Sequence, residues 1–359
     1  MQQLIFVYPG DVNTPTGGYA YDRRMIEGLE RLRWHVQMIS LGEGYPFPNP
    51  IQEEYARSVL LHLTKGIPMV IDGLALGALP HLAIDLAKRH PLIALIHHPL
   101  AFEFGLSDQE IKSLLQSERL ALQHVVQIIA NSPSTARDLI QHYDIRPEII
   151  NVILPGTDRV TNLESSSKGS AESKNRVHLL SVGSIIPRKG FHYLIAALEP
   201  LVDLPWNLTI VGDHSRHIAA YELLMTDIKC FHLENRVQVL GTVSKQNLDY
   251  LYTHSDVFVL ASLFEGYGMV YAEAMAYGLP IIATTGGAIP DTVPKEAGLL
   301  VPPADIPALT AALKTLIQDP LYRARLSRGA LQAASQQPTW EYAVQQFITV
   351  LARLTLPSA

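Results

Sequence analysis

The sequence is almost devoid of cysteine and has no excess of basic residues. Its 359 residues include one cysteine, Cys230. A single cysteine excludes an intrachain disulfide and fits a reducing compartment, and we interpret Cys230 as a small core residue. The net charge is -6. Nucleic acid is therefore not an expected partner, because binding to phosphate backbones calls for a basic surplus.

Long apolar runs are also absent. A membrane-spanning helix needs about 20 mostly apolar residues. The longest such stretch, 68–87, is interrupted by Asp72, Pro80, His81 and Asp85. The N-terminal segment MQQLIFVYPG is too short and lacks the basic leader of a signal peptide. The sequence therefore predicts a soluble, cytoplasmic protein and leaves peripheral contact with a membrane open.

Short segments rich in Val and Ile alternate with longer segments of helical period. This alternation is typical of a doubly wound α/β domain, and nearly continuous apolar strands are typical of parallel sheets. The strands predicted in the first half are 4–8, 35–40, 68–72, 92–98, 125–131 and 150–154. The strands predicted in the second half are 178–183, 207–212, 236–241, 256–261, 280–284 and 298–302.

A serine-rich polar segment, 161–176, separates the two sets of strands. Together with the chain length it predicts two Rossmann-like domains that face each other across a cleft. We place the first domain at 1–165, joined by a C-terminal helix at 339–357, and the second at 170–335. The polar segment is interpreted as a flexible linker that lets the domains close on substrate. Ligands of such sheets lie at the carboxyl ends of the strands.

The segment after strand 256–261 reads SLFEGYGMVYAEAMAYGLP. Gly266 and Gly268 leave the backbone open to a ligand, and a helix is predicted to begin near Met269. N–H groups at a helix start bind anionic oxygens such as those of a diphosphate. Glu265 before the helix and Glu273 inside it could hold two hydroxyl-bearing parts of one ligand. From spacing alone, a simple glycine turn followed by a solvated glutamate remains an alternative.

This segment resembles the family-4 retaining glycosyltransferases of the GT-B fold, whose signature is two glutamates separated by seven residues. The likeness continues through four further motifs of the second half and, more loosely, two of the first half. These motifs are VGSIIPRKGFHYLIAAL (182–198), IVGDH (210–214), VLGTVSKQNLDYLYTHSD (239–256), AGLLVPPADIPALTAAL (297–313), TGGYAYDRRMIEGL (16–29) and LPGTD (154–158).

The resemblance implies that the second domain binds a nucleotide-sugar donor. Glu273 would bind the ribose diol, and Glu265 would lie beside the donor sugar. Backbone N–H groups would hold the sugar hydroxyls at Gly266, Tyr267 and Gly268, and the phosphate at Met269 and Val270.

Two bases of the motif PRKG complete the implied donor site. Lys189 would neutralise the diphosphate. The family usually has an arginine where this chain has Ser184, and Arg188 is the candidate replacement. The alternative is that both bases are ordinary surface charges.

The resemblance assigns the acceptor to the first domain. Gly17 and Gly18, in the loop after the first strand, would bring backbone close to the donor phosphate and the acceptor, unless they are simple turn glycines. His98 aligns best with the active-site histidine of the family, and His97 is the weaker choice. His98 and Asp72 would contact the acceptor. A satisfied polar histidine and a loop-capping aspartate are the respective alternatives.

The implied reaction moves a hexosyl group from a UDP-, GDP- or ADP-linked sugar to a hydroxyl of a saccharide, lipid carrier or small molecule. Its catalytic residues would be His98, Glu265 and Lys189, with the cations and the helix start stabilising the leaving diphosphate. Front-face attack is the favoured scheme, with Glu265 as a sugar-orienting group and not a covalent nucleophile. No metal-ligand spacing is visible, so we expect no metal and no cofactor besides the co-substrate.

Two other functions share this fold. A disaccharide phosphorylase would keep the same glutamates, and a binding protein would keep the fold without activity. A nucleotide-dependent oxidoreductase is not expected, because neither half contains a G-x-G-x-x-G after a strand. The sequence leaves the base, the sugar, the acceptor and the oligomeric state open.

Overall fold

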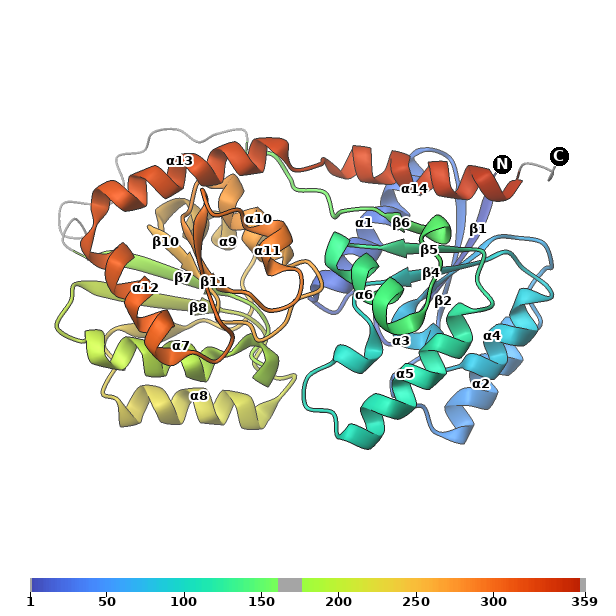
Figure 1. The fold of residues 1–359 in the computed structure, drawn as a ribbon, viewed down its shortest axis with the longest axis horizontal. Coiled ribbons are helices and arrows are strands. Elements are labelled where there is room, and N and C mark those ends of the chain that lie inside the picture. Colours follow the sequence, from blue (N-terminus) through green and yellow to red (C-terminus); the bar gives the residue numbers. More distant parts are fainter. Residues whose placement is uncertain (1, 161–175, 356–359) are drawn as a thin grey trace. The chain divides into compact units, whose positions relative to one another are not determined.

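The computed structural model describes residues 2–160 and 176–355. The chain divides into two compact units (Figure 1). Unit 1 consists of Met1–Gly156 and Pro338–Ala359, and unit 2 of Thr157–Gln337. The chain therefore returns to unit 1 after completing unit 2. Except for Arg176, the predicted linker lies outside the described residues.

Unit 1 contains a parallel six-stranded sheet in the order β2-β1-β3-β4-β5-β6. In register, Leu4 of β1 is opposite Val36 of β2, and Ile5 is opposite Met69 of β3. The strands are β1 (Gln3–Tyr8), β2 (His35–Ser40), β3 (Met69–Asp72), β4 (Leu92–Ile96), β5 (Gln127–Ala130) and β6 (Ile150–Val152). The helices are α1 (Gly17–Arg31), α2 (Pro50–Leu60), α3 (Gly73–Leu76), α4 (Pro80–Ala87), η1 (Leu100–Phe102), α5 (Asp108–Leu122), α6 (Pro133–Tyr143), η2 (Pro147–Ile149) and α14 (Trp340–Thr355).

Unit 2 contains a second parallel six-stranded sheet, in the order β12-β11-β10-β7-β8-β9. Its strands are β7 (Val177–Val182), β8 (Trp206–Val211), β9 (Val237–Val239), β10 (Val257–Val259), β11 (Ile281–Thr284) and β12 (Gly298–Val301). Its helices are η4 (Pro187–Lys189), α7 (Phe191–Leu198), η5 (Glu199–Leu201), α8 (Ile218–Cys230), α9 (Lys245–His254), α10 (Met269–Ala276), α11 (Ile289–Thr292), α12 (Ile306–Gln318) and α13 (Pro320–Gln336).

The central strands are buried along their length because helices cover both faces of each sheet. Every residue of β3, β4 and β11 is buried. Several helices begin at a side chain that accepts a backbone N–H, and α2 and α5 begin with full capping boxes at Asn49 and Ser107. Each unit has its own apolar core. Within the described ranges, no helix combines the length and the apolar character needed to cross a membrane.

Helix α14 follows unit 2 in the sequence but packs against α1 of unit 1 (Figure 1). Gly28 of α1 makes this contact close, because a Cβ there would meet Val344 at 2.3 Å. The Trp340 ring lies edge-on to Tyr21, with 6.1 Å between centroids. The Arg24 guanidinium lies 5.4 Å from the centroid of the Trp340 ring.

The prediction that Cys230 is a core residue is wrong, because its side chain is exposed. Cys230 is the last residue of α8, whose buried face carries Leu224 and Ile228. The cysteine falls outside that face, so its small apolar character does not determine its position.

Candidate functional site

The strand order of unit 2 reverses between β7 and β10. Ligands of open α/β sheets bind beyond the carboxyl ends of strands at such a point. The chain leaving β7 enters η4, which carries Arg188 and Lys189. The chain leaving β10 carries Ser262 and Glu265 ahead of α10. The topology therefore brings together residues that are far apart in the sequence.

Glu265 is buried, with 6% of its surface exposed. It binds Lys189 and Arg188, the two basic residues predicted to contact the diphosphate. Its Oε1 accepts hydrogen bonds from Lys189 Nζ at 2.6 Å and from Ser262 Oγ at 2.6 Å. Its Oε2 accepts one from Arg188 Nη1 at 3.1 Å, and that nitrogen also donates to the Phe264 carbonyl at 2.6 Å. One buried carboxylate thus holds two cations at the reversal point of the sheet.

The two cations keep Glu265 ionised. Burial raises the pKa of Glu265, but the Lys189 and Arg188 charges and the hydrogen bonds to the carboxylate outweigh burial and hold the pKa at about 2. Burial lowers the pKa of Lys189 below its ordinary value, and the charge of Glu265 opposes that effect. A carboxyl group with so low a pKa cannot act as a general acid near neutral pH.

Helix α10 begins beside this ion cluster, and none of the described side chains caps its first turn. Its N-cap is Gly268, with φ of 85°, a conformation that glycine adopts without strain. A Cβ at Gly268 would meet the Tyr271 ring at 2.5 Å. Met269 and Val270 are the first residues of the helix, where backbone N–H groups attract anions.

Glu273 lies in the second turn of α10 and is partly buried. Its Oε2 accepts a hydrogen bond from the hydroxyl of Tyr252 on α9 at 3.2 Å. Gly266 and Tyr267 lie in the loop between the two glutamates, and the Tyr267 hydroxyl donates to Gln337 Oε1 at 2.7 Å. The loop is thus anchored by the side chains of Glu265 and Tyr267.

Ser184 follows β7 and is buried. The neighbouring backbone is crowded, since a Cβ at Gly212 would lie 1.8 Å from the Gly183 carbonyl oxygen. An arginine in place of Ser184 would have its long side chain next to this crowded backbone. That Arg188 replaces the missing arginine stays a prediction.

In unit 1, one histidine after β4 lies close to two carboxylates, one at the end of β3 and one on α1. His97 Nε2 lies 3.1 Å from Asp22 Oδ1 and 3.5 Å from Asp72 Oδ2. The other oxygen of Asp72 accepts from the Leu74 N–H at 2.7 Å. Asp72 thus caps the segment that follows, which is the short helix α3 and not the predicted loop. Contact of Asp72 with an acceptor stays a prediction.

Burial and charge interactions together set the pKa values of this cluster. Burial lowers the pKa of His97, but the carboxylates of Asp22 and Asp72 raise it to about 9. Burial and the Asp22 charge raise the pKa of Asp72 to about 7. His97 is therefore a buried imidazolium at neutral pH.

Gly17 and Gly18 are the first two residues of α1, so their prediction as loop residues is wrong. The cause is Thr16, whose hydroxyl accepts the Tyr19 N–H at 3.2 Å and starts the helix earlier than expected. A Cβ at Gly18 would lie 3.2 Å from the His97 ring. Gly18 therefore lies against the charge cluster.

His98, the predicted active-site histidine, has a different environment. Its Nε2 lies 2.9 Å from Glu103 Oε2 in a partly exposed pair. The structure thus places His97, the weaker choice, beside Gly18 and Asp72, and pairs His98 with Glu103. The catalytic role of His98 stays a prediction.

The ligand atoms of Asp22, Asp72 and His97 lie within 4.8 Å of one another, close enough to share a divalent cation. Sequence spacing could not predict this set, because its members come from α1, β3 and the end of β4. The 3.1 Å contact between His97 and Asp22 is itself an ion pair, and we interpret the set as a buried charge cluster.

Two segments of the chain match family models. Residues 176–319 match the model for glycosyl transferases group 1, and residues 60–160 match the model for glycosyltransferase family 4. The MMP alpha-(1->4)-mannosyltransferase of Mycolicibacterium hassiacum is 27% identical in an alignment 333 positions long, which covers 86% of this chain and 75% of that protein. The D-inositol 3-phosphate glycosyltransferase of Corynebacterium glutamicum is 29% identical in an alignment 264 positions long, which covers 68% of this chain and 63% of that protein. This chain is a glycosyltransferase.

Solved structures show the fold of this glycosyltransferase. Sucrose-phosphate synthase from Thermosynechococcus elongatus matches with a TM-score of 0.83 and 21% identity over 100% of both chains. Anabaena HepE, solved in complex with UDP and glucose, matches with a TM-score of 0.76 and 21% identity over 98% of this chain and 100% of that chain. These likenesses confirm the predicted GT-B fold, with a doubly wound parallel sheet in each unit.

Sequence reasoning missed several polar residues of the glycosyltransferase. Asp22 had a signal, because helical period places it on the same buried face as Met25 and Leu29, where a carboxylate is unusual. Ser262 also had one, since it directly follows a predicted strand. Tyr252 had none, because it reaches Glu273 only through tertiary structure.

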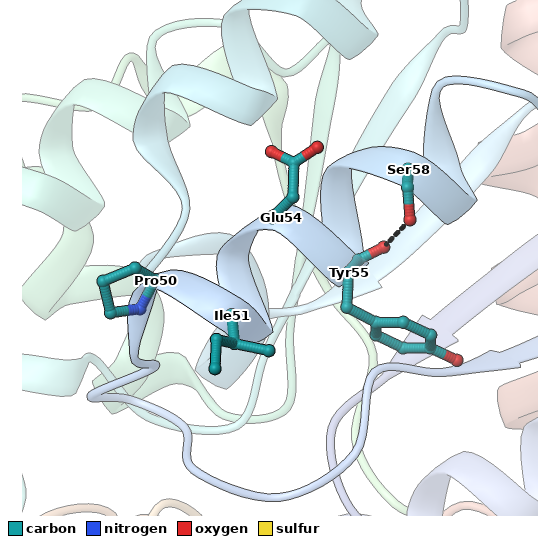
Figure 2. Close-up of a pocket in the computed structure, with 5 residues that line it drawn as sticks. All are labelled: Pro50, Ile51, Glu54, Tyr55 and Ser58. Atoms are coloured by element: carbon teal, nitrogen blue, oxygen red, sulfur yellow. Dashed lines mark hydrogen bonds between the residues drawn. The ribbon is translucent and has the colours of Figure 1, made fainter.

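A pocket on α2 of the glycosyltransferase lies apart from these residues. Figure 2 shows the side chains that line it, with the Ser58 hydroxyl bonded to the Tyr55 carbonyl at 2.8 Å. Ile51 and Tyr55 are exposed. The lining contains none of the residues predicted for the donor or the acceptor.

Proposed function

We propose that the protein is a retaining glycosyltransferase that moves a hexosyl group from a nucleotide-diphosphate sugar to an acceptor hydroxyl, with the nucleotide held by unit 2. The observation that carries this proposal is the convergence of Lys189 and Arg188 on Glu265 beside the uncapped start of α10. Two cations and a helix N-terminus at one point suit a diphosphate.

The arrangement also suits the leaving group of the reaction. Glycosyl transfer passes through an oxocarbenium-like transition state while negative charge develops on the departing diphosphate. Lys189 and Arg188 are already oriented before substrate arrives, so little reorganisation is needed to stabilise that charge. Glu265 stays ionised and lies next to both cations, where it can orient the donor sugar.

Glu273 is proposed to bind the ribose diol. A carboxylate can accept two hydrogen bonds side by side, which matches two vicinal hydroxyls. Its place in the second turn of α10 puts it on the same helix that offers N–H groups to the phosphates. The binding of UDP by the structural neighbour HepE is consistent with such a donor.

Unit 1 is proposed to supply the acceptor side. Its sheet reverses order between β1 and β3. Gly18 lies at the start of α1, which follows β1, and Asp72 is the last residue of β3. His98 is retained as the candidate active-site histidine. The acceptor is proposed to be a saccharide, a lipid carrier or a small molecule, and the protein to act in the cytoplasm or at a membrane surface without a resident metal or cofactor.

The test has a binding step and a product step. Isothermal calorimetry with UDP, GDP and ADP should identify one nucleotide that binds, and its sugar conjugates should then be hydrolysed slowly or transferred. NMR of the product should show the anomeric configuration of the donor. An inverted product contradicts retention, release of sugar phosphate from a disaccharide indicates a phosphorylase, and binding without turnover of any conjugate indicates a non-catalytic protein.

A further inference from the structure

Tyr252 is a core residue of unit 2 whose buried hydroxyl is explained neither by packing nor by the proposed reaction. It lies on α9 with 2% of its surface exposed. A phenylalanine would fill the same apolar space, and burying a hydroxyl is unfavourable unless it is hydrogen-bonded. The partner of its hydroxyl is Glu273 Oε2, at 3.2 Å. The hydroxyl therefore acts on a residue of the proposed donor site.

The ring of Tyr252 is held in place by two aromatic neighbours. It stacks on Tyr277, with 5.0 Å between centroids and planes 16° apart. The centroid of the Phe258 ring, on β10, lies 6.2 Å from that of Tyr252. The Tyr277 hydroxyl is itself bonded to Asp249 Oδ1 at 2.6 Å. A ring fixed in this way gives its hydroxyl one direction, and that direction is toward Glu273.

Burial and the nearby Glu273 charge raise the pKa of Tyr252 well above its ordinary value, so its hydroxyl stays protonated. A protonated phenol has one hydrogen to donate, and a carboxylate oxygen can accept more than one hydrogen bond. Donation to Oε2 thus restricts rotation of the Glu273 carboxylate.

We propose that Tyr252 is a positioning residue for the nucleotide ribose, because its hydroxyl sets the plane in which the Glu273 carboxylate accepts the two hydroxyls of the diol. This inference rests on the proposed function, which assigns Glu273 to the ribose. A fixed plane matters because two parallel hydrogen bonds form only when both carboxylate oxygens face the diol. Tyr252 would therefore contribute to the preference for ribose over 2′-deoxyribose without touching the nucleotide.

Tyr252→Phe tests the proposal, since it keeps the ring and its stacking and removes one oxygen. The probes are UDP, GDP and ADP and their 2′-deoxy counterparts, measured by calorimetry on the full chain. In the unaltered protein the ribonucleotide should bind more tightly than its 2′-deoxy form. In Tyr252→Phe this preference should fall by about five- to tenfold, because the loss concerns a hydrogen bond to a charged group. Affinity for the 2′-deoxy form should change by less than about twofold.

Tyr277→Phe is the matched control. It removes a hydroxyl from the stacked neighbour, whose bond is to Asp249, and should leave the preference for ribose unchanged. Equal weakening of both nucleotides by Tyr252→Phe would show a merely structural role and overturn the proposal. An unchanged preference would overturn it as well.

Glu273→Gln separates failure of this inference from failure of the proposed function. If Glu273→Gln lowers the preference for ribose and Tyr252→Phe does not, the positioning role is wrong and the ribose assignment stands. If neither variant lowers it, or if none of the three nucleotides binds, the assignment of Glu273 to the ribose is wrong and the positioning role with it.

Discussion

At the scale of single residues, the proposed donor site of unit 2 is built around one carboxylate that pairs with two basic side chains. Glu265 holds Lys189 at 2.6 Å and Arg188 at 3.1 Å. Taking charges out of water is unfavourable unless they are paired and hydrogen-bonded, and here each group has at least one charged partner. The two cations are therefore held in place by an ionised Glu265 before any ligand binds. That arrangement favours binding of a doubly charged diphosphate over binding of a neutral sugar.

Replacement of Lys189 by methionine should show what this charge contributes. Lys189→Met keeps most of the side-chain length and leaves Glu265 bonded to Arg188 and Ser262. We expect kcat to fall about 100-fold, the usual order for loss of one electrostatic stabiliser of a transition state. Steady-state kinetics with the best-binding nucleotide sugar measures this. Lys295→Met is the control, because the Lys295 side chain is 92% exposed. Equal kcat in both variants would remove Lys189 from the catalytic set.

The charge cluster of unit 1 predicts how stability depends on pH. The pKa of His97 is raised from 6.5 to about 9, so the native state binds its proton more tightly than the unfolded chain does. The stability from this group is complete below pH 6.5 and is lost as pH rises through about 9. Asp72, with its pKa raised to about 7, acts in the same direction at lower pH. The free energy of unfolding should therefore fall between pH 6.5 and 9.

Asp22→Asn should reduce that fall, because it removes the nearest carboxylate from His97. We expect the loss between pH 6.5 and 9 to shrink by about 2 kcal/mol, measured by urea unfolding at both pH values. Glu27→Gln replaces an exposed acid on the same helix and should retain the pH dependence of the unaltered protein. An Asp22→Asn protein with the same pH dependence would show that His97 is not ion-paired with Asp22 in solution.

At the scale of elements, the start of α10 depends on a glycine for two separable reasons. Gly268 has φ of 85°, and a Cβ there would meet the Tyr271 ring at 2.5 Å. Gly66 has the same φ of 85°, but a Cβ there would point into open space, with none of the described atoms within 4 Å. Gly66→Ala should cost only the left-handed backbone, about 1–2 kcal/mol. Gly268→Ala should cost more, about 3 kcal/mol in total, because a buried ring must also move.

Urea unfolding of both alanine variants measures these costs, and calorimetry adds the functional consequence. Gly268→Ala should weaken nucleotide binding, since the residue precedes the N–H groups proposed for the phosphate. Gly66→Ala should bind as the unaltered protein does. Nucleotide affinity that is equal in the two variants would show that the α10 start does not take part in binding.

The elements that the sequence predicts well are those set by local pattern. The apolar run at 92–98 contains β4, and the glycine turn before Met269 leads into α10 where predicted. The start of α1 is missed by local reasoning, because Thr16 caps the helix ahead of two glycines that read as a loop. Contacts such as Tyr252 to Glu273 cannot be predicted locally, since they depend on which strands become neighbours. The choice of His98 over His97 does not anticipate the cluster with Asp22 for the same reason.

At the scale of the whole molecule, two cores without a common residue predict two units that unfold separately. The chain crosses from unit 2 back to unit 1 near Pro338, and α14 completes unit 1. The serine-rich segment predicted as a linker lies outside the described residues, so the separation rests on the cores and on this return. Damage to α14 should therefore affect unit 1, although α14 comes last in the sequence.

Trp340→Ala tests this independence. Trp340 is buried against Tyr21 and Arg24, and its loss should cost unit 1 about 3–5 kcal/mol, the usual range for a buried tryptophan. Scanning calorimetry should show one transition shifted down and the other unchanged. Addition of the nucleotide that binds should raise only the unchanged transition, because ligand stabilises the unit that holds it. Tyr342→Ala, at a 59% exposed position of the same helix, should shift neither transition by more than about 1 °C. A single transition that moves with both Trp340→Ala and nucleotide would show that the units unfold as one, and the nucleotide shift could then no longer be assigned to unit 2.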